Sequence, residues 1–174
     1  MSRIPTALRS AALAATLAFV TGAVAIPAAF AAEEVNITNG YAVHGYDVVA
    51  YHTMGKPTEG SDQFVAEHDG AKYRFASAEN LAMFQADPAK FAPAYGGYCA
   101  FGTAFGRKFD GDPQAWRIVD GKLYLNLNQK VQTRWLEDPN GYINGADHNW
   151  AIIANVADKD LEANPPADLT QGPQ

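Results

Sequence analysis

Apolar and polar residues alternate in two segments of the chain, and an Asp-Gly pair interrupts each segment near its middle. The first segment covers residues 63–76, with Asp69-Gly70 inside it, and the second covers residues 117–126, with Asp120-Gly121 inside it. Alternation with a period of two is typical of half-buried strands. Asp-Gly supplies the positive φ angles that a type I′ turn requires. The pattern therefore predicts two β-hairpins.

A short helix is predicted after each hairpin. Ser77 precedes the segment AENLAMFQA, and Asn128 precedes QKVQTRWLE. Side-chain oxygens of Ser and Asn accept hydrogen bonds from the free N–H groups at a helix start, so both residues are expected to be N-caps. Asp-Pro follows each helix, at residues 87–88 and 138–139. Because proline favours the first position of a helix, the first of these pairs predicts a further helical turn.

The two hairpin–helix segments have the same spacing along the chain. A shift of 51 residues aligns them without a gap, although few residues are identical. The aligned pairs are Asp69-Gly70 and Asp120-Gly121, Tyr73 and Tyr124, Ser77 and Asn128, Phe84 and Trp135, Asp87-Pro88 and Asp138-Pro139, and Phe91 and Tyr142. Convergent turn chemistry is the alternative to a degenerate internal duplication. We predict a compact single α+β domain with two β-hairpin–helix units around a small antiparallel sheet.

A further strand is predicted ahead of the first hairpin. The segment YDVVAYHT is rich in β-branched and aromatic residues and is followed by Gly55 and Pro57. In a strand every second side chain points to the same face. His52 and Met54 would then share one face, in line with residues 48 and 50.

The two ends of the chain differ in composition from the rest. An alanine-rich apolar run follows two arginines, and Ala29 and Ala31 match the A-x-A cue of a signal peptidase. Residues 1–31 are therefore predicted to be a secretory signal peptide rather than a membrane anchor, which implies a periplasmic protein. Residues 32–156 form the predicted domain. Residues 157–174, which end in NPPADLTQGPQ, are predicted to be a disordered tail.

The charge balance narrows the expected partners. Removal of the leader takes away two arginines and no acidic residue, so the formal charge changes from −6 to −8. An acidic protein without a run of Lys or Arg is a poor match for nucleic acids and anionic membranes. We expect no nucleic-acid partner, no membrane contact after signal cleavage, and a monomer or a weak homodimer.

Cys99 is the only cysteine, and it lies among glycines and aromatic rings in YGGYCAFGTAFG. Exported proteins enter an oxidising compartment, where a single thiol has no partner for an internal disulfide. Four states are therefore open to Cys99. It is buried and inert, coordinated to a metal, reactive, or paired with another chain.

Other side chains could complete a metal site with Cys99. An imidazole and a thioether, from His52 and Met54, suit Cu(I) together with a thiolate, whereas imidazole, thiolate and carboxylate also suit Zn(II). Asp47 and His44 precede the predicted strand in a glycine-containing turn. Asp47 can cap a turn, orient an imidazole or ligate the metal itself. An amphipathic strand without a metal is the alternative.

Two other classes of function are open. Seven aromatic residues can line a pocket for a non-metal ligand or a partner protein, although such rings also form cores. They are Tyr95, Tyr98, Phe101, Phe105, Trp116, Trp135 and Trp150. A thiol-dependent redox enzyme centred on Cys99 would need a thiolate. No G-x-S-x-G, H-E-x-x-H or C-x-x-C motif is present, so we expect a binding protein rather than an enzyme. We interpret His68 as a solvated hairpin residue and Asp147 as a helix cap.

Three segments resemble exported bacterial YHS-domain proteins: GYDVVAYHTMGKPTEGSDQF, YRFASAENLAMFQADPAKFAPAYGGYCAFG and DPQAWRIVDGKLYLNLN. The resemblance covers residues 39–150, and YGGYCA with DGKLYLN is its most specific part. The wider YHS group is linked to heavy-metal and copper handling through cysteines in small modules. Those cysteine positions correspond here to Ala50, Ala76 and Asn80, which supply no thiolate. The subfamily usually has Ala-Tyr-Phe where this chain has AYHTM, so His52 replaces an aromatic residue.

The residues and the resemblance together imply a periplasmic metal-binding protein that stores, delivers or confers tolerance to its metal. Copper is the expected metal and zinc the less favoured one. Cys99 and His52 are the first expected ligands, with Met54, Asp47 and His44 as further ones. Haem is left open, since the attachment motif C-x-x-C-H is absent and axial ligands cannot be assigned from one chain.

Overall fold

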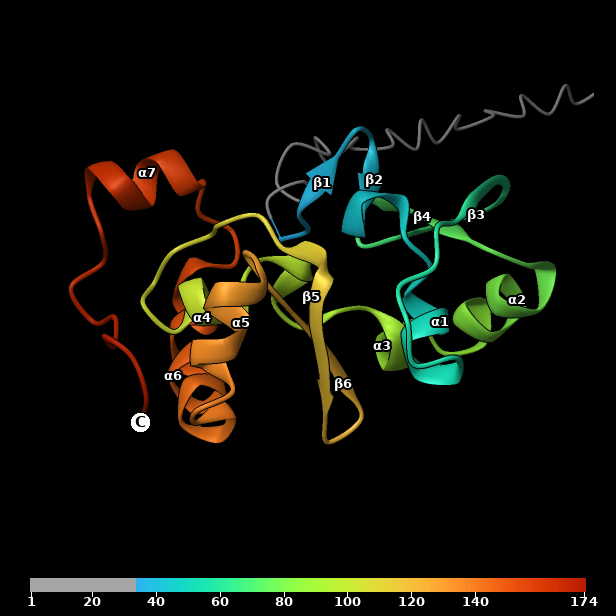
Figure 1. Cartoon of the computed structure of the whole chain (residues 1–174). Coiled ribbons are helices and arrows are strands. Elements are labelled where there is room, and N and C mark those ends of the chain that lie inside the picture. The colour runs from blue at the N-terminus through green and yellow to red at the C-terminus, as the bar shows by residue number, and fades with distance from the viewer. Residues whose placement is uncertain (1–33) are drawn as a thin grey trace, which may run out of the picture.

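The computed structural model of the protein describes residues 34–174, and the predicted signal peptide lies outside them (Figure 1). The described part begins with a two-stranded ribbon, β1 (Ile37–Thr38) and β2 (Tyr41–Ala42), and then forms two similar units. Unit one contains η2 (Val43–Gly45), α1 (Val48–Thr53), β3 (Ser61–His68), β4 (Ala71–Phe75), α2 (Ala78–Ala86) and α3 (Pro88–Phe91). Unit two contains η3 (Ala94–Gly97), α4 (Ala100–Thr103), β5 (Asp112–Val119), β6 (Lys122–Asn126), α5 (Gln129–Trp135) and α6 (Pro139–Ile153). A last helix, α7 (Asp158–Ala163), follows.

The predicted α+β class and the two β-hairpin–helix units are confirmed. The strands form three separate antiparallel two-stranded sheets, β1–β2, β3–β4 and β5–β6, in place of one small sheet. Ser77 and Asn128 cap α2 and α5, each accepting a hydrogen bond from the backbone N–H three residues later. Asp87 and Asp138 likewise cap the helices that begin at the following prolines.

The duplication extends to an irregularity inside each hairpin. In the first hairpin the pairing moves from Ser61 with Phe75 to Val65 with Arg74. In the second it moves from Asp112 with Asn126 to Trp116 with Leu125. The second set of positions is the first set plus 51, so both hairpins have the same bulge at the same place. A bulge at equivalent positions of both hairpins supports a common origin of the two units more strongly than the turn residues alone do.

The duplicated unit also begins earlier than the sequence pattern indicated. Three consecutive residues have positive φ angles in each unit, at residues 43–45 and again at residues 95–97. Here the shift is 52 residues, so one residue is lost between α4 and β5 relative to unit one. Gly96 has no room for a side chain, because a Cβ atom would lie 1.7 Å from the carbonyl oxygen of Glu34. The glycines of YGGYCA therefore serve this left-handed turn and its contact with the N-terminal segment.

The prediction of a strand at residues 48–54 is wrong. These residues form helix α1, with Met54 as its C-cap. The Asp47 side chain accepts hydrogen bonds from two backbone N–H groups of the first turn, which stabilises a helix despite the β-branched residues. The helix buries residues 48–51 in the core, so tertiary packing outweighs local β propensity. His52 and Met54 consequently do not share a strand face.

Two clusters of buried apolar side chains hold the units together. The first contains residues of unit one, such as Tyr73 and Phe84, and also Leu123 and Leu125 from β6 of unit two. The second lies within unit two and includes Trp135. Because β6 contributes to both clusters, the second hairpin joins the two units.

Residues 157–174 are the tail that composition predicted to be disordered. They form α7 and then an extended segment that packs against unit two. The Asn149 side chain bonds to the backbone of Thr170 in both directions, and the N–H of Gly172 donates to Ala104. The hydrogen bonds to the buried Asn149 side chain on α6 offset part of the conformational entropy that the segment loses when it is ordered. Among the described residues, no helix is long and apolar enough to cross a membrane.

Candidate functional site

Asp47, a predicted ligand, is fully buried and its carboxylate is saturated with hydrogen bonds. One oxygen accepts from the backbone N–H groups of Val49 and Ala50, at 2.8 and 3.2 Å. The other accepts from the backbone N–H of Ala76 and the side-chain amide of Asn80, at 2.8 and 2.6 Å. Two of the positions that the YHS resemblance assigns to cysteines, Ala76 and Asn80, thus contact a carboxylate. Asp47 ties α1 to the end of the first hairpin and to α2.

Cys99 occupies the position in unit two that Asp47 occupies in unit one. It is the N-cap of α4, and its Sγ accepts from the N–H of Gly102 at 3.3 Å. Its backbone N–H donates to Phe109 as that of Asp47 donates to Thr58, both at 2.8 Å. The thiol is 1% exposed and lies 3.9 Å from the side-chain oxygen of Asn126. The geometry supports a structural cap, the first of the four states left open.

Burial raises the pKa of the Cys99 thiol, while hydrogen bonds from the backbone of Gly102, Leu127 and Phe101 act in the opposite direction. A raised pKa keeps the thiol protonated near neutral pH. Both a soft metal ligand and a redox nucleophile need the thiolate. The surroundings of Cys99 therefore favour neither role.

The three remaining predicted ligands lie in different environments. The His52 ring packs edge-to-face on Phe91, with ring centroids 5.3 Å apart, and burial and the charge of Lys90 lower its pKa. Met54 is 53% exposed. His44 pairs through Nε2 with Asp110 at 2.9 Å. Within residues 34–174, no three His, Cys, Asp or Glu side chains are grouped closely enough to hold a metal ion.

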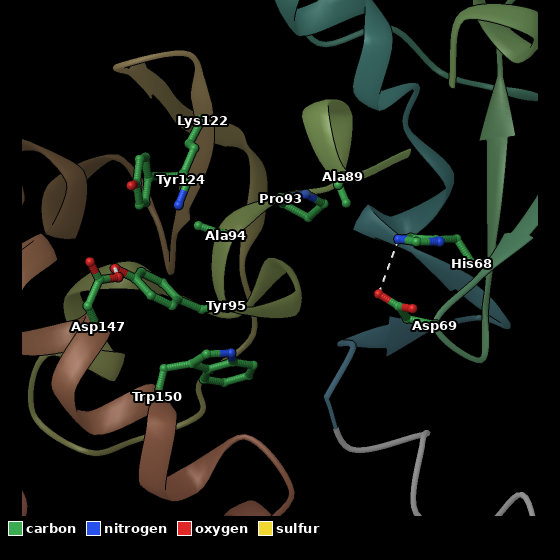
Figure 2. Close-up of a pocket in the computed structure, with 11 residues that line it drawn as sticks. His68, Asp69, Ala89, Pro93, Ala94, Tyr95, Lys122, Tyr124, Asp147 and Trp150 are labelled. Carbon is green, nitrogen blue, oxygen red and sulfur yellow. Dashed lines mark hydrogen bonds and ion pairs between the residues drawn. The ribbon is translucent and has the colours of Figure 1, made fainter. Parts of the chain in front are cut away.

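A cavity of about 320 Å³ lies where the two units meet (Figure 2). Unit one contributes His68 and Asp69 from the first hairpin turn, and the segment that joins α3 to η3 contributes alanines and Pro93. Unit two contributes residues of η3, β6 and α6. A concave site between structural units, of this size, suits a small molecule.

Aromatic rings form one wall of the cavity. Tyr95 lies 5.8 Å from both Tyr124 and Trp150, measured between ring centroids. Trp150 is held from behind by Lys108, whose buried ammonium group lies 5.3 Å from the ring centroid and bonds to the carbonyl oxygen of Ala154 at the end of α6. This contact stabilises the orientation of the Trp150 ring.

Polar groups in the cavity converge on the same wall. Asp147 accepts a hydrogen bond from the Tyr95 hydroxyl at 2.8 Å through one oxygen, which leaves its other oxygen without a partner among the described residues. The Lys122 ammonium group makes no ion pair or hydrogen bond within residues 34–174. Burial, followed by the charges of Asp147 and Asp120, raises the pKa of Tyr124 to about 12, so its hydroxyl is a neutral donor.

The cavity differs in part from the sequence predictions. Of the seven rings expected to line a pocket, Tyr95 and Trp150 line this cavity and the other five do not. Lys122, Asp147 and His68 line it although they were not expected to take part. Asp147 is not a helix cap, because α6 begins eight residues earlier at Pro139. His68 pairs with Asp69 at 3.1 Å on the wall that faces the aromatic rings (Figure 2). The local sequence around Lys122 and around His68 does not indicate a site. The two residues line the same cavity only because the two units pack against each other.

Comparisons of the chain with protein-family models, with curated proteins and with solved structures found no match. The class of protein is therefore defined by the structure itself, as an α+β domain made of two related hairpin–helix units. Membership of the YHS-domain group stays a prediction from the residues that resemble it.

Proposed function

We propose that the protein binds a small organic molecule in the cavity between its two units. One observation carries the proposal: three aromatic rings, the Lys122 ammonium group without an internal partner and one unpartnered oxygen of Asp147 border the same cavity of about 320 Å³. Ligand sites combine apolar walls with a few placed polar groups in this way. With the predicted leader, the ligand would be met in the periplasm.

Filling the cavity with a side chain tests the proposal. Ala89 lines the cavity and is exposed, whereas Ala86 is exposed on the neighbouring helix and is outside the lining. A panel of amino acids, amines, carboxylic acids and sugars is added to the mature protein at millimolar concentration, and the thermal unfolding midpoint is measured. A ligand at about 100 times its Kd should stabilise the fold by about 2.7 kcal/mol.

The Ala89→Trp variant should lose this stabilisation, and the matched Ala86→Trp variant should keep it. Two results would reject the proposal. One is that no compound in the panel raises the midpoint. The other is that Ala89→Trp responds as strongly as the wild type.

Copper binding stays a second candidate because of one observation at His52. Its Nε2 atom is buried without a hydrogen-bond partner, and the lowered pKa keeps the imidazole neutral with a lone pair available. Titration with Cu(I) against a competing chelator tests this role, with Cys99→Ser and His52→Phe as variants. An affinity that neither substitution changes would remove Cys99 and His52 from the candidate ligands.

A further inference from the structure

The cavity contains charges of both signs that do not neutralise each other. Lys122 comes from β6 and Asp147 from α6, and the two side chains form no ion pair. Figure 2 shows the Lys122 ammonium group directed toward the aromatic wall, with Asp147 beside Tyr95 on the same wall. A charged group on a cavity wall without a protein partner is solvated until a ligand of opposite charge replaces the water.

We infer that the ligand is a small zwitterion, an α-amino acid with an aromatic or aliphatic side chain. This inference rests on the proposed function. The carboxylate of the amino acid would bind the Lys122 ammonium group, and its ammonium group would bind the oxygen of Asp147 that has no partner. The Tyr95 hydroxyl orients Asp147 through its other oxygen at 2.8 Å, so one carboxylate oxygen stays directed to the ligand.

Charge matching separates a zwitterion from other small molecules. A simple amine would satisfy Asp147 and leave Lys122 without a partner, and a simple carboxylic acid would do the opposite. Neutral sugars would pair with neither charge. Partial desolvation of an unpaired charge costs free energy, so a ligand with both charges gains at both ends.

The aromatic wall indicates the remainder of the ligand. Trp150 is half-buried and offers ring surface to an apolar side chain, whereas Tyr95 and Tyr124, which are 6% and 4% exposed, contribute little. The cavity volume is near the lower end of the range of small-molecule sites, which favours a ligand of amino-acid size over a nucleotide or a peptide.

Isothermal titration with matched compounds tests the inference. L-Phenylalanine, L-tryptophan and L-leucine carry both charges, phenethylamine lacks the carboxylate, and 3-phenylpropanoate lacks the ammonium group. We expect at least one of the three amino acids to bind. The affinity of the tightest one should be at least about tenfold higher than the affinity of phenethylamine and that of 3-phenylpropanoate.

Two exposed residues allow the contacts to be removed without disturbing the core. Lys122→Met should weaken amino-acid binding about tenfold to hundredfold and leave phenethylamine binding unchanged. Asp147→Asn, which keeps an acceptor for the Tyr95 hydroxyl, should weaken both amino-acid and phenethylamine binding. Lys72→Met and Asp120→Asn are controls outside the cavity lining, and they should bind as the wild type does.

The failure of the inference is distinct from the failure of the proposed function. Suppose a single-charge or neutral compound binds at least as tightly as the best of the three amino acids, and Ala89→Trp abolishes that binding. The inference that the ligand is a zwitterion is then wrong, and the cavity remains a ligand site. If Lys122→Met and Asp147→Asn leave amino-acid affinity unchanged, the assigned contacts are wrong. If none of the compounds binds the protein and the panel above also gives no response, both proposals fall.

Discussion

The two units have the same path of the chain, and two of their differences bear on the site, the cap of the first helix and the length of the last. Unit one uses the buried carboxylate of Asp47, and unit two uses the buried thiol of Cys99 at the equivalent position. Asp47 accepts four hydrogen bonds from three segments, whereas sulfur is a weak acceptor. The same backbone geometry is therefore stabilised with very different strength in the two units.

The last helix of unit two supplies part of the cavity lining. In unit one α3 has four residues, and in unit two α6 has fifteen. Helix α6 packs against α4 (Figure 1). Asp147 and Trp150 lie in the part of α6 that has no counterpart in unit one. The longer last helix of unit two thus supplies part of the cavity wall.

The largest effect should come from removing the unit one cap. Asp47→Ala would leave two backbone N–H groups at the start of α1, that of Ala76 and the Asn80 amide without their acceptor. We expect a loss of about 3–5 kcal/mol in the free energy of unfolding, measured by urea denaturation. Asp47→Asn keeps an oxygen for some of these donors and should lose less. A cost for Asp47→Ala below about 1 kcal/mol would contradict the role of this carboxylate.

A smaller effect is expected at the equivalent position of unit two. Cys99→Ala removes a weak cap and leaves a small cavity, for an expected loss of about 1–2 kcal/mol. Cys99→Ser replaces the sulfur with a stronger acceptor and should lose less than Cys99→Ala. If Cys99→Ala costs as much as Asp47→Ala, the sulfur does more than cap α4, and the titration with Cu(I) becomes the deciding experiment.

The smallest effect is a pH dependence that only unit one should show. The equivalent of His52 in unit two is Ala104, which cannot titrate. Burial lowers the pKa of His52 below its ordinary value of 6.5, so the unfolded chain takes up the proton more readily than the folded protein. Its contribution to stability is therefore present above pH 6.5 and is lost as the pH falls below it.

Urea denaturation between pH 7.5 and pH 5 checks this sign. The decline in unfolding free energy with falling pH should be shallower in His52→Phe than in the wild type. A matched His68→Phe variant controls for the loss of another half-buried histidine of the same unit. Equal slopes in the wild type and His52→Phe would mean that the His52 imidazole is as accessible to protons in the folded state as in the unfolded chain.

The hairpins and their following helices were predictable because local chemistry specifies them. Asp-Gly turns, Ser and Asn caps, and Asp-Pro helix starts each act within a few residues of themselves. The helix at residues 48–53 was not predictable from propensity, since Val48 and Val49 favour strands when considered alone. Its helical form depends on the carboxylate of Asp47, which is itself held by the distant residues Ala76 and Asn80.

The candidate site was predictable only in its aromatic part. The sequence identified Tyr95 and Trp150 as candidate pocket-lining residues but did not indicate where they lie in the fold. No sequence motif near Lys122 or Asp147 indicated a binding role. The predicted metal ligands illustrate the opposite error. His52 and Met54 are two residues apart in sequence, and the helix directs them differently, so proximity in the chain did not become proximity in space.

The amino-acid sequence by itself determined the duplicated order of turns, caps and helices, because these features depend on contacts between residues close together in the chain. Only the tertiary structure decided the rest. Packing between residues far apart in the chain buries Cys99 and Asp47 and makes residues 48–53 helical. It also places Lys122 and Asp147 in the lining of one cavity. Local chemistry constrains none of these distances.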